Sequence, residues 1–164
     1  MMLKNCIGAV TAFALCLSAW PQSASPHSGI AQDPWNPAHL NNLPSEIRVE
    51  VKKWEAACGA PIAVAQRFAL YLTVPRTQFV ALHFDDFRCR NNKAVCNTSG
   101  CLHEVYAASR GRYRKVLTVH AEDVRLLREQ DAALLEIQDR PNVARRLLRW
   151  NGTGFTNWTK TKNR

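Results

Sequence analysis

The cysteines of this 164-residue chain constrain its fold more than any other feature. Three of the six lie close together in the segment CRNNKAVCNTSGC, residues 89–101, and Cys58 precedes that segment. Such a group can form disulfides, hold a zinc ion or act as a redox pair, depending on the compartment in which the chain folds. The compartment therefore has to be inferred first.

The N-terminus, MMLKNCIGAVTAFALCLSAW, has the features of an export signal. A single Lys4 precedes an uncharged run over residues 6–20, which is shorter than the roughly twenty apolar residues that a membrane span needs. Small residues just before Gln32 favour cleavage there, with cleavage near Ala24 as the alternative. We therefore predict a signal peptide over residues 1–31, a periplasmic or extracellular location, and no membrane span after cleavage.

Export leaves four cysteines in an oxidising compartment. Their spacings fit a structural zinc site poorly, because such sites bring their ligands as close pairs about two to four residues apart, and no two-residue redox spacing is present. Of the three possible pairings we predict Cys58–Cys89, which ties the end of a helix to the end of a strand, and Cys96–Cys101, which closes the loop NTSG. We expect no metal ion and no cofactor.

One amphipathic helix is predicted over residues 43–59. Pro44 suits its first turn, Glu46 favours the positive end of its dipole, and Gly59 can adopt the left-handed conformation that ends a helix. Its apolar positions recur at spacings of four, four, three and four: Leu43, Ile47, Val51, Trp54 and Cys58. Residues 32–42, QDPWNPAHLNN, show no periodicity and are expected to form an extended leader into the domain.

The remainder of the chain reads as β-hairpins. Large apolar side chains alternate on both sides of PRTQ at 75–78, and two further β-rich runs flank Arg110-Gly111-Arg112. Asn151-Gly152 lies between bulky residues and is a strong hairpin signal. Residues 121–139 have helical composition but lie between sheet units, so we favour two short strands around Gln130-Asp131, with a helix as the alternative.

These elements predict an α+β fold: one N-terminal amphipathic helix packed on a small antiparallel sheet of about six strands, held by two disulfides. The single domain should span residues 43–158, and residues 159–164 should be a disordered basic tail.

Positive charge is concentrated in the last third of the chain. Residues 110–164 hold thirteen Lys and Arg against six Asp and Glu, whereas residues 32–109 hold eight against seven. This asymmetry indicates an acidic protein, polysaccharide or lipid surface as partner rather than nucleic acid; the alternative is that basicity serves only solubility. The candidate binding residues are Arg145, Arg146, Arg149, Trp158, Lys160 and Lys162. The competing interpretation pairs Trp150 with Phe155 in the core and leaves the basic tail solvated.

Histidines lie beside carboxylates in LHFDDF, LHEV and VHAED. If His83 and Asp85 met His103 from a neighbouring strand, an acid/base pair or a metal site could form, as hydrolysis requires. The default expectation is that these polar residues lie on the solvated face of an antiparallel sheet. The sequence has no nucleophile elbow, phosphate-binding loop or zinc-protease helix motif.

The segments CRNNKAVCNTSGC, CLHEVYAASRGRYR and RRLLRWNGTGF carry a resemblance. Over residues 43–156 the chain resembles small uncharacterised exported proteins of proteobacteria, particularly of the rhizobial kind. The resemblance implies a helix, a strand ending in Cys, a short Gly-containing loop to a second Cys, and closing hairpins with an Arg and Trp-Asn-Gly turn. It carries no known activity, so it assigns no catalytic residue.

Together these features predict an exported, non-catalytic binding or inhibitor-like protein whose basic C-terminal third contacts an anionic partner. An enzyme is the less favoured reading: a small secreted hydrolase that uses His83, Asp85 and His103.

Overall fold

The computed structural model describes residues 35–59 and 61–159, which belong to one unit of the chain, Ala31–Arg164. The expected signal peptide with its two cleavage sites lies outside the described residues, and so do Lys160 and Lys162 of the basic tail.

The segment that leads into the domain is partly helical. A 3-10 helix, η1 (Pro37–Asn42), replaces most of the extended leader expected from the sequence. The Asn36 side chain accepts a hydrogen bond from the Ala38 N–H at 2.8 Å, and Pro37 pre-sets the first backbone angle, so the two residues together start the turn. Leu40 is buried by this conformation and anchors the segment to the core.

The predicted amphipathic helix forms, in two short pieces. α1 (Ser45–Lys52) and α2 (Trp54–Cys58) are separated at Lys53, and Gly59 ends α2 in the left-handed region at φ 64°. The expected apolar stripe faces the core: Leu43, Ile47, Val51 and Cys58 are buried and Trp54 packs against them. The helical periodicity was therefore read correctly, but the break at Lys53 was not predicted.

The described residues contain three antiparallel sheets rather than one sheet of about six strands. Sheet A pairs β1 (Ala63–Val64) with β4 (Phe87–Arg88). Sheet B has the order β2-β3-β6-β5, with β7 also paired to β6: β2 (Ala69–Val74), β3 (Thr77–His83), β5 (Cys96–Asn97), β6 (Gly100–Ser109) and β7 (Arg112–Ala121). Sheet C has the order β11-β10-β9-β8: β8 (Asp123–Glu129), β9 (Ala132–Gln138), β10 (Arg146–Trp150) and β11 (Phe155–Asn157). Short 3-10 turns connect some of them: η2 (Gln66–Phe68), η3 (Phe84–Asp86) and η4 (Asn92–Ala94).

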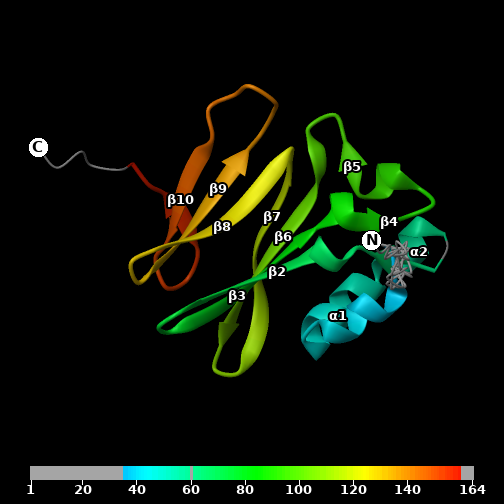
Figure 1. Cartoon of the computed structure of the whole chain (residues 1–164), viewed down its shortest axis with the longest axis horizontal. Helices are drawn as coiled ribbons and strands as arrows, with labels where there is room; N and C mark the ends of the chain where they lie inside the picture. The colour runs from blue at the N-terminus through cyan, green and yellow to red at the C-terminus, as the bar shows by residue number, and fades with distance from the viewer. Residues whose placement is uncertain (1–34, 60, 160–164) are drawn as a thin grey trace, which may run out of the picture. The chain divides into compact units, whose positions relative to one another are not determined.

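The central strands of sheet B, β3 and β6, are buried on both faces. Alternate residues of these strands point to opposite sides, so Val80 and Leu82 pack with the helices while Phe79 and Ala81 pack with sheet C. Figure 1 shows α1 and strands β8–β10 on opposite sides of β2, β3 and β6. The coarse prediction of a helix against antiparallel sheet thus holds, but a second sheet covers the face expected to be solvated.

The hairpin turns occur where the sequence places them. β2 and β3 are joined at Pro75-Arg76, and β6 and β7 at Arg110-Gly111, whose φ values are 52° and 76°. The prediction of strands for residues 121–139 is confirmed: these residues form β8 and β9, with Gln130 at φ 53° in the turn between them. The β10–β11 loop is longer than a two-residue turn. Within it, the Asn151 side chain accepts hydrogen bonds from two backbone N–H groups.

Both expected disulfides are present. Cys58–Cys89 joins the end of α2 to the residue after β4, and Cys96–Cys101 bridges two residues that are directly paired between β5 and β6. The longer bridge closes a separation of 31 residues and the shorter one a separation of 5, so chain entropy alone favours the longer bridge as the greater stabiliser. Within the described part of the chain, no helix has the length and apolar character to cross a membrane.

Candidate functional site

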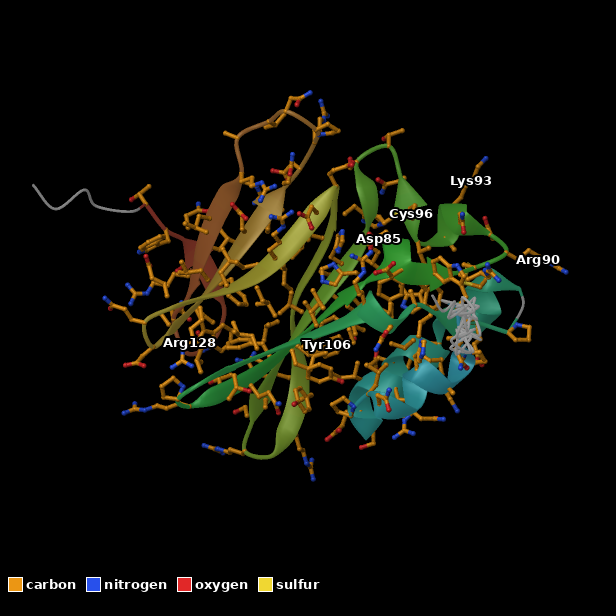
Figure 2. All side chains as sticks on the ribbon, in the orientation of Figure 1. Asp85, Arg90, Lys93, Cys96, Tyr106 and Arg128 are labelled. Carbon is orange, nitrogen blue, oxygen red and sulfur yellow. A yellow bond between two sulfur atoms is a disulfide. The ribbon has the colours of Figure 1, made fainter. Side chains whose placement is uncertain are left out.

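A cavity of about 390 Å³ lies where sheets B and C meet. One wall is strand β8, at the edge of sheet C, and the other comes from η2, β2 and the end of β3 with η3. Its lining residues are Arg67, Leu70, His83, Asp85, Asp86, Asp123, Val124, Arg125, Leu126 and Leu127. Asp85, labelled in Figure 2, lies on the 3-10 turn that follows β3.

The three residues of the predicted histidine–carboxylate site lie close together, and two of them, His83 and Asp85, line this cavity. His83 and His103 are directly opposite each other in the β3–β6 register, and their Nδ1 atoms are 3.2 Å apart. One ligand atom from each histidine and a carboxylate oxygen of Asp85 all lie within 4.8 Å of one another. The strand pairing brings the histidines together, and η3 turns the chain so that Asp85 follows them.

The two histidines are buried, which corrects the expectation of a solvated face. The exposed fraction is 7% for His83 and 1% for His103, whereas Asp85 is exposed. Both histidines have the strand parity of Phe79, Ala81 and Val105, the residues of sheet B that pack against sheet C. They are covered because sheet C lies over this face.

Hydrogen bonding fixes the tautomer of His103. Its Nε2 lies 3.2 Å from the carbonyl oxygen of Ala121, which can only accept, so Nε2 carries the proton. Burial lowers the pKa of His103, and the neighbouring His83 lowers it further. A neutral His103 therefore presents an unprotonated Nδ1 to His83, and the His83 Nδ1–H donates to it.

Charges around the cavity act on both imidazoles. Burial lowers the pKa of His83, while Asp85 and Asp123 oppose that shift and Arg67 adds to it. Asp123 at the start of β8 forms an ion pair with Arg125 at 2.7 Å. Asp86 is partly buried, and burial together with neighbouring Asp85 raises its pKa. Asp86 and Asp123 were not chosen as site residues from the sequence, although both occur in the histidine–carboxylate segments LHFDDF and VHAED.

Glu104 lies on the opposite side of sheet B from the histidine cavity. It is 2% exposed, accepts a hydrogen bond from Tyr106 Oη at 2.6 Å and pairs with Lys115 Nζ at 2.5 Å. Adjacent positions on a strand face opposite ways, so Glu104 cannot assist its neighbour His103. Its contacts are those of a buried charge that is paired and hydrogen-bonded within the core.

The predicted basic binding residues that the structure describes differ in whether a carboxylate neutralises them. Arg145 pairs with Glu136 at 2.7 Å, and Arg146 makes two bonds to Asp139, at 2.6 and 2.7 Å. Arg149 is exposed and has no carboxylate partner among the described residues. The partly buried Trp158 follows β11, and its backbone N–H donates to the Leu147 carbonyl at 2.9 Å.

Trp150 belongs to the core, as the competing interpretation expected. It pairs with Phe155 at a ring separation of 5.3 Å and packs edge-on against Phe79 at 5.1 Å. The Arg114 guanidinium lies over the Trp150 ring, 5.8 Å from the ring centroid. Arg114 Nη2 also donates to the Thr153 carbonyl at 2.7 Å. Nothing in the sequence connects Arg114 with Trp150, because the two meet only when sheets B and C pack together.

A second cavity, of about 400 Å³, adjoins Trp150. It is lined by Val74, Pro75, Arg76, Thr77, Asp131, Trp150 and Gly152. Arg76 on the β2–β3 turn and Arg110, Arg112 and Arg114 of the β6–β7 hairpin have no carboxylate partner within the described residues.

No family model, curated protein or solved structure matches this chain.

Proposed function

We propose that this chain is an exported, non-catalytic binding protein of the inhibitor-like kind, which contacts an anionic partner through its basic C-terminal third. The partner would be an acidic protein, a polysaccharide or a lipid surface. The contact would be centred on Arg110, Arg112 and Arg114 of the β6–β7 hairpin, which have no carboxylate partner among the described residues. Trp158, Lys160 and Lys162 lie in the same third of the chain and would contribute to the contact.

The observation that carries this proposal is the unequal neutralisation of the arginines. Arg145 and Arg146 are held by Glu136 and Asp139, whereas the arginines of the β6–β7 hairpin have no carboxylate partner among the described residues. Arg114 also lies over the face of Trp150 beside the 400 Å³ cavity. An arginine next to an aromatic ring suits a carboxylate, sulfate or phosphate group, because the fork of N–H groups can donate to two oxygens at once.

The proposal is tested by measuring retention on an immobilised acidic polysaccharide and on vesicles with an anionic lipid, with neutral polysaccharide and neutral vesicles as references. Two double variants are compared, Arg112→Ser/Arg114→Ser and Arg145→Ser/Arg146→Ser, which change the net charge equally. We expect binding that weakens steeply with salt and that the hairpin variant loses more strongly. Binding that ignores ionic strength would rule out the electrostatic contact, and equal loss in both variants would rule out its location.

A second candidate is a small hydrolase, and the convergence of His83, Asp85 and His103 beside a cavity favours it. Neutral imidazoles beside a carboxylate are groups that general acid/base catalysis uses. Turnover of a panel of ester and phosphoester substrates should then be lost in Asp85→Asn, whose exposed side chain is not needed for folding. Absence of turnover in the unmodified protein with every substrate of the panel would eliminate this candidate.

A further inference from the structure

Three potential metal ligands, two imidazoles and a carboxylate, lie close together beside the 390 Å³ cavity. The Nδ1 atoms of His83 and His103 are 3.2 Å apart, and Asp85 offers an oxygen within 4.8 Å of the histidine ligand atoms. Two nitrogens bound to one tetrahedral zinc ion, each about 2.0 to 2.1 Å from it, lie about 3.3 to 3.4 Å apart. The observed separation therefore accommodates an ion once the proton that His83 donates to His103 moves from Nδ1 to Nε2 of His83.

The hydrogen bond from His103 to Ala121 prepares His103 as a ligand. Because Nε2–H donates to the Ala121 carbonyl at 3.2 Å, the lone pair of His103 is on Nδ1, which faces His83. Metal-binding histidines commonly donate their second ring N–H to a carbonyl or carboxylate in this way, which fixes both the tautomer and the ring orientation. Burial lowers the pKa of both histidines and keeps them in the neutral form that coordinates metals.

His83 shows a deficit that a histidine held only by core packing would not have. Its Nδ1 is engaged with His103, but its Nε2 is buried and has no hydrogen-bond partner among the described residues. His83 is 7% exposed and lines the 390 Å³ cavity beside Asp85. A buried polar atom without a partner is destabilising and calls for a specific explanation, and with no partner at Nε2 no hydrogen bond there fixes the tautomer of His83.

The charge of the cavity favours a cation. Three carboxylates line it, Asp85, Asp86 and Asp123, against the guanidinium groups of Arg67 and Arg125. Asp123 is paired with Arg125, which leaves Asp85 as the exposed carboxylate next to the histidines. The cysteines are not available as competing ligands, since all four in the described residues are in disulfides.

We propose that His83, His103 and Asp85 form a binding site for a divalent transition-metal ion of the zinc type. The cavity leaves the remaining coordination position open to water or to an anionic ligand. Two imidazoles and one carboxylate suit zinc, cobalt or copper, whereas magnesium prefers a site made of oxygen ligands alone. This site is separate from the arginines of the proposed anion-binding surface, so neither proposal depends on the other.

The test is calorimetry of the chelator-treated protein with Zn²⁺, with Mg²⁺ as the negative reference. We expect one Zn²⁺ per chain and no heat with Mg²⁺. Visible absorption of the Co²⁺-loaded protein should show the intense bands of a four-coordinate ion, and ¹⁵N chemical shifts of the imidazoles should identify Nδ1 of His103 as a ligand. The same shifts establish which nitrogen of His83 binds.

Asp85→Asn is the main variant, because its side chain is exposed and its loss should not affect folding. Asp131→Asn, an exposed carboxylate outside the cluster, and His120→Gln, a partly buried histidine on β7, are the matched controls. Zn²⁺ affinity should fall at least about tenfold in Asp85→Asn and stay unchanged in the controls. His103→Asn should abolish binding, with circular dichroism checking the fold.

Three results would overturn the proposal: no Zn²⁺ binding by the unmodified protein, equal affinity in Asp85→Asn and the controls, or unchanged imidazole ¹⁵N shifts on adding Zn²⁺. The last two remain decisive even if His103→Asn fails to fold. They report on the unmodified site or on an exposed residue.

Discussion

At the scale of single residues, the buried histidine pair makes stability depend on pH. Burial lowers the pKa of His83 and His103 in the folded protein, so protons bind the unfolded chain more strongly. Both are neutral in either state well above the ordinary histidine pKa of about 6.5, and stability is then unaffected. As the pH falls below that value, the unfolded state gains protons first and stability declines.

Each histidine should contribute a slope of up to about 1.4 kcal/mol per pH unit, until the pH reaches its folded-state pKa. Asp85 and Asp123 reduce the lowering of the His83 pKa, and Arg67 increases it. The measurement is the free energy of urea unfolding, in the presence of a chelator, between about pH 8 and pH 5.5. A double variant, His83→Asn/His103→Asn, should lose most of the slope; if it kept the full slope, other groups would be responsible.

A second residue-scale prediction concerns the Tyr106 hydroxyl. Burial and the adjacent Glu104 carboxylate raise the pKa of Tyr106, so the hydroxyl stays protonated and donates to Glu104 at 2.6 Å. Tyr106→Phe removes a donor from a buried carboxylate and should cost about 1.5 to 3 kcal/mol of unfolding free energy. Tyr113→Phe removes an exposed hydroxyl that donates to Gln78 and serves as the control.

The control should change stability by less than about 0.5 kcal/mol. Urea unfolding of both variants at neutral pH gives the comparison. An equally small loss of unfolding free energy in Tyr106→Phe would mean that the Lys115 ion pair alone satisfies Glu104.

The candidate site was predictable from the sequence only in part. His83, Asp85 and His103 were recognised because histidine and carboxylates occur together in the segments, and the hairpin pattern allowed His83 and His103 to be neighbours. Their burial was not predictable, since it depends on sheet C covering that face. Asp123 contributes to the cavity only because the chain crosses from β7 to β8 beside it.

At the scale of elements, the β5–β6 turn depends on one glycine. Gly100 has φ +114°, and a Cβ there would lie 2.1 Å from the Ala121 carbonyl oxygen and 2.3 Å from its carbon. These are backbone atoms of β7 that cannot move without breaking the β6–β7 pairing. Gly100→Ala should therefore cost about 3 kcal/mol or more.

Gly111→Ala is the matched control for that prediction. Gly111 also has a positive φ, +76°, but open space surrounds the position of its missing Cβ. Only the backbone penalty applies, about 1 to 2 kcal/mol. Unfolding by urea separates the two, and equal costs would show that the close approach to Ala121 is relieved by a small shift of β7.

Local patterns predicted the elements better than their assembly. The helix stripe, the turns at Arg110-Gly111 and Gln130-Asp131, and the core pair Trp150–Phe155 all follow from neighbouring residues. η1 was missed because the signal that starts it is a single capping residue before a proline, Asn36-Pro37. The interruption at Lys53 has no counterpart in the apolar spacing, which continues across it.

At the scale of the whole molecule, the sequence could not distinguish one sheet from several. Antiparallel hairpins join in the same way whether the next strand continues a sheet or begins another. The burial pattern holds the clue: every residue from Phe79 to His83 is buried, which a sheet with one solvated face does not allow. In the sequence this appears as FVALHF, where Phe79 and Ala81 take positions expected to be polar.

Because the central strands of sheet B are covered on both faces, their unfolding should expose the helix-side and sheet C-side cores together. Trp54 packs against Phe84 on the helix side, with ring centroids 5.6 Å apart, and Trp150 packs against Phe79 on the other side at 5.1 Å. We expect a single cooperative transition reported equally by the two tryptophans, since losing either core removes the support of the shared strands.

The measurement uses two variants in which all tryptophans but one are changed to phenylalanine, leaving Trp54 in one and Trp150 in the other. In each, the midpoint of urea unfolding from tryptophan fluorescence should coincide with the midpoint from far-ultraviolet circular dichroism. Comparing both signals within one variant removes the effect of the substitutions on stability. An earlier fluorescence midpoint for Trp54 would mean that the helices detach first, despite the Cys58–Cys89 bridge that ties α2 to the segment after β4. An earlier midpoint for Trp150 would mean that sheet C, which no disulfide joins to sheet B in the described residues, unfolds on its own.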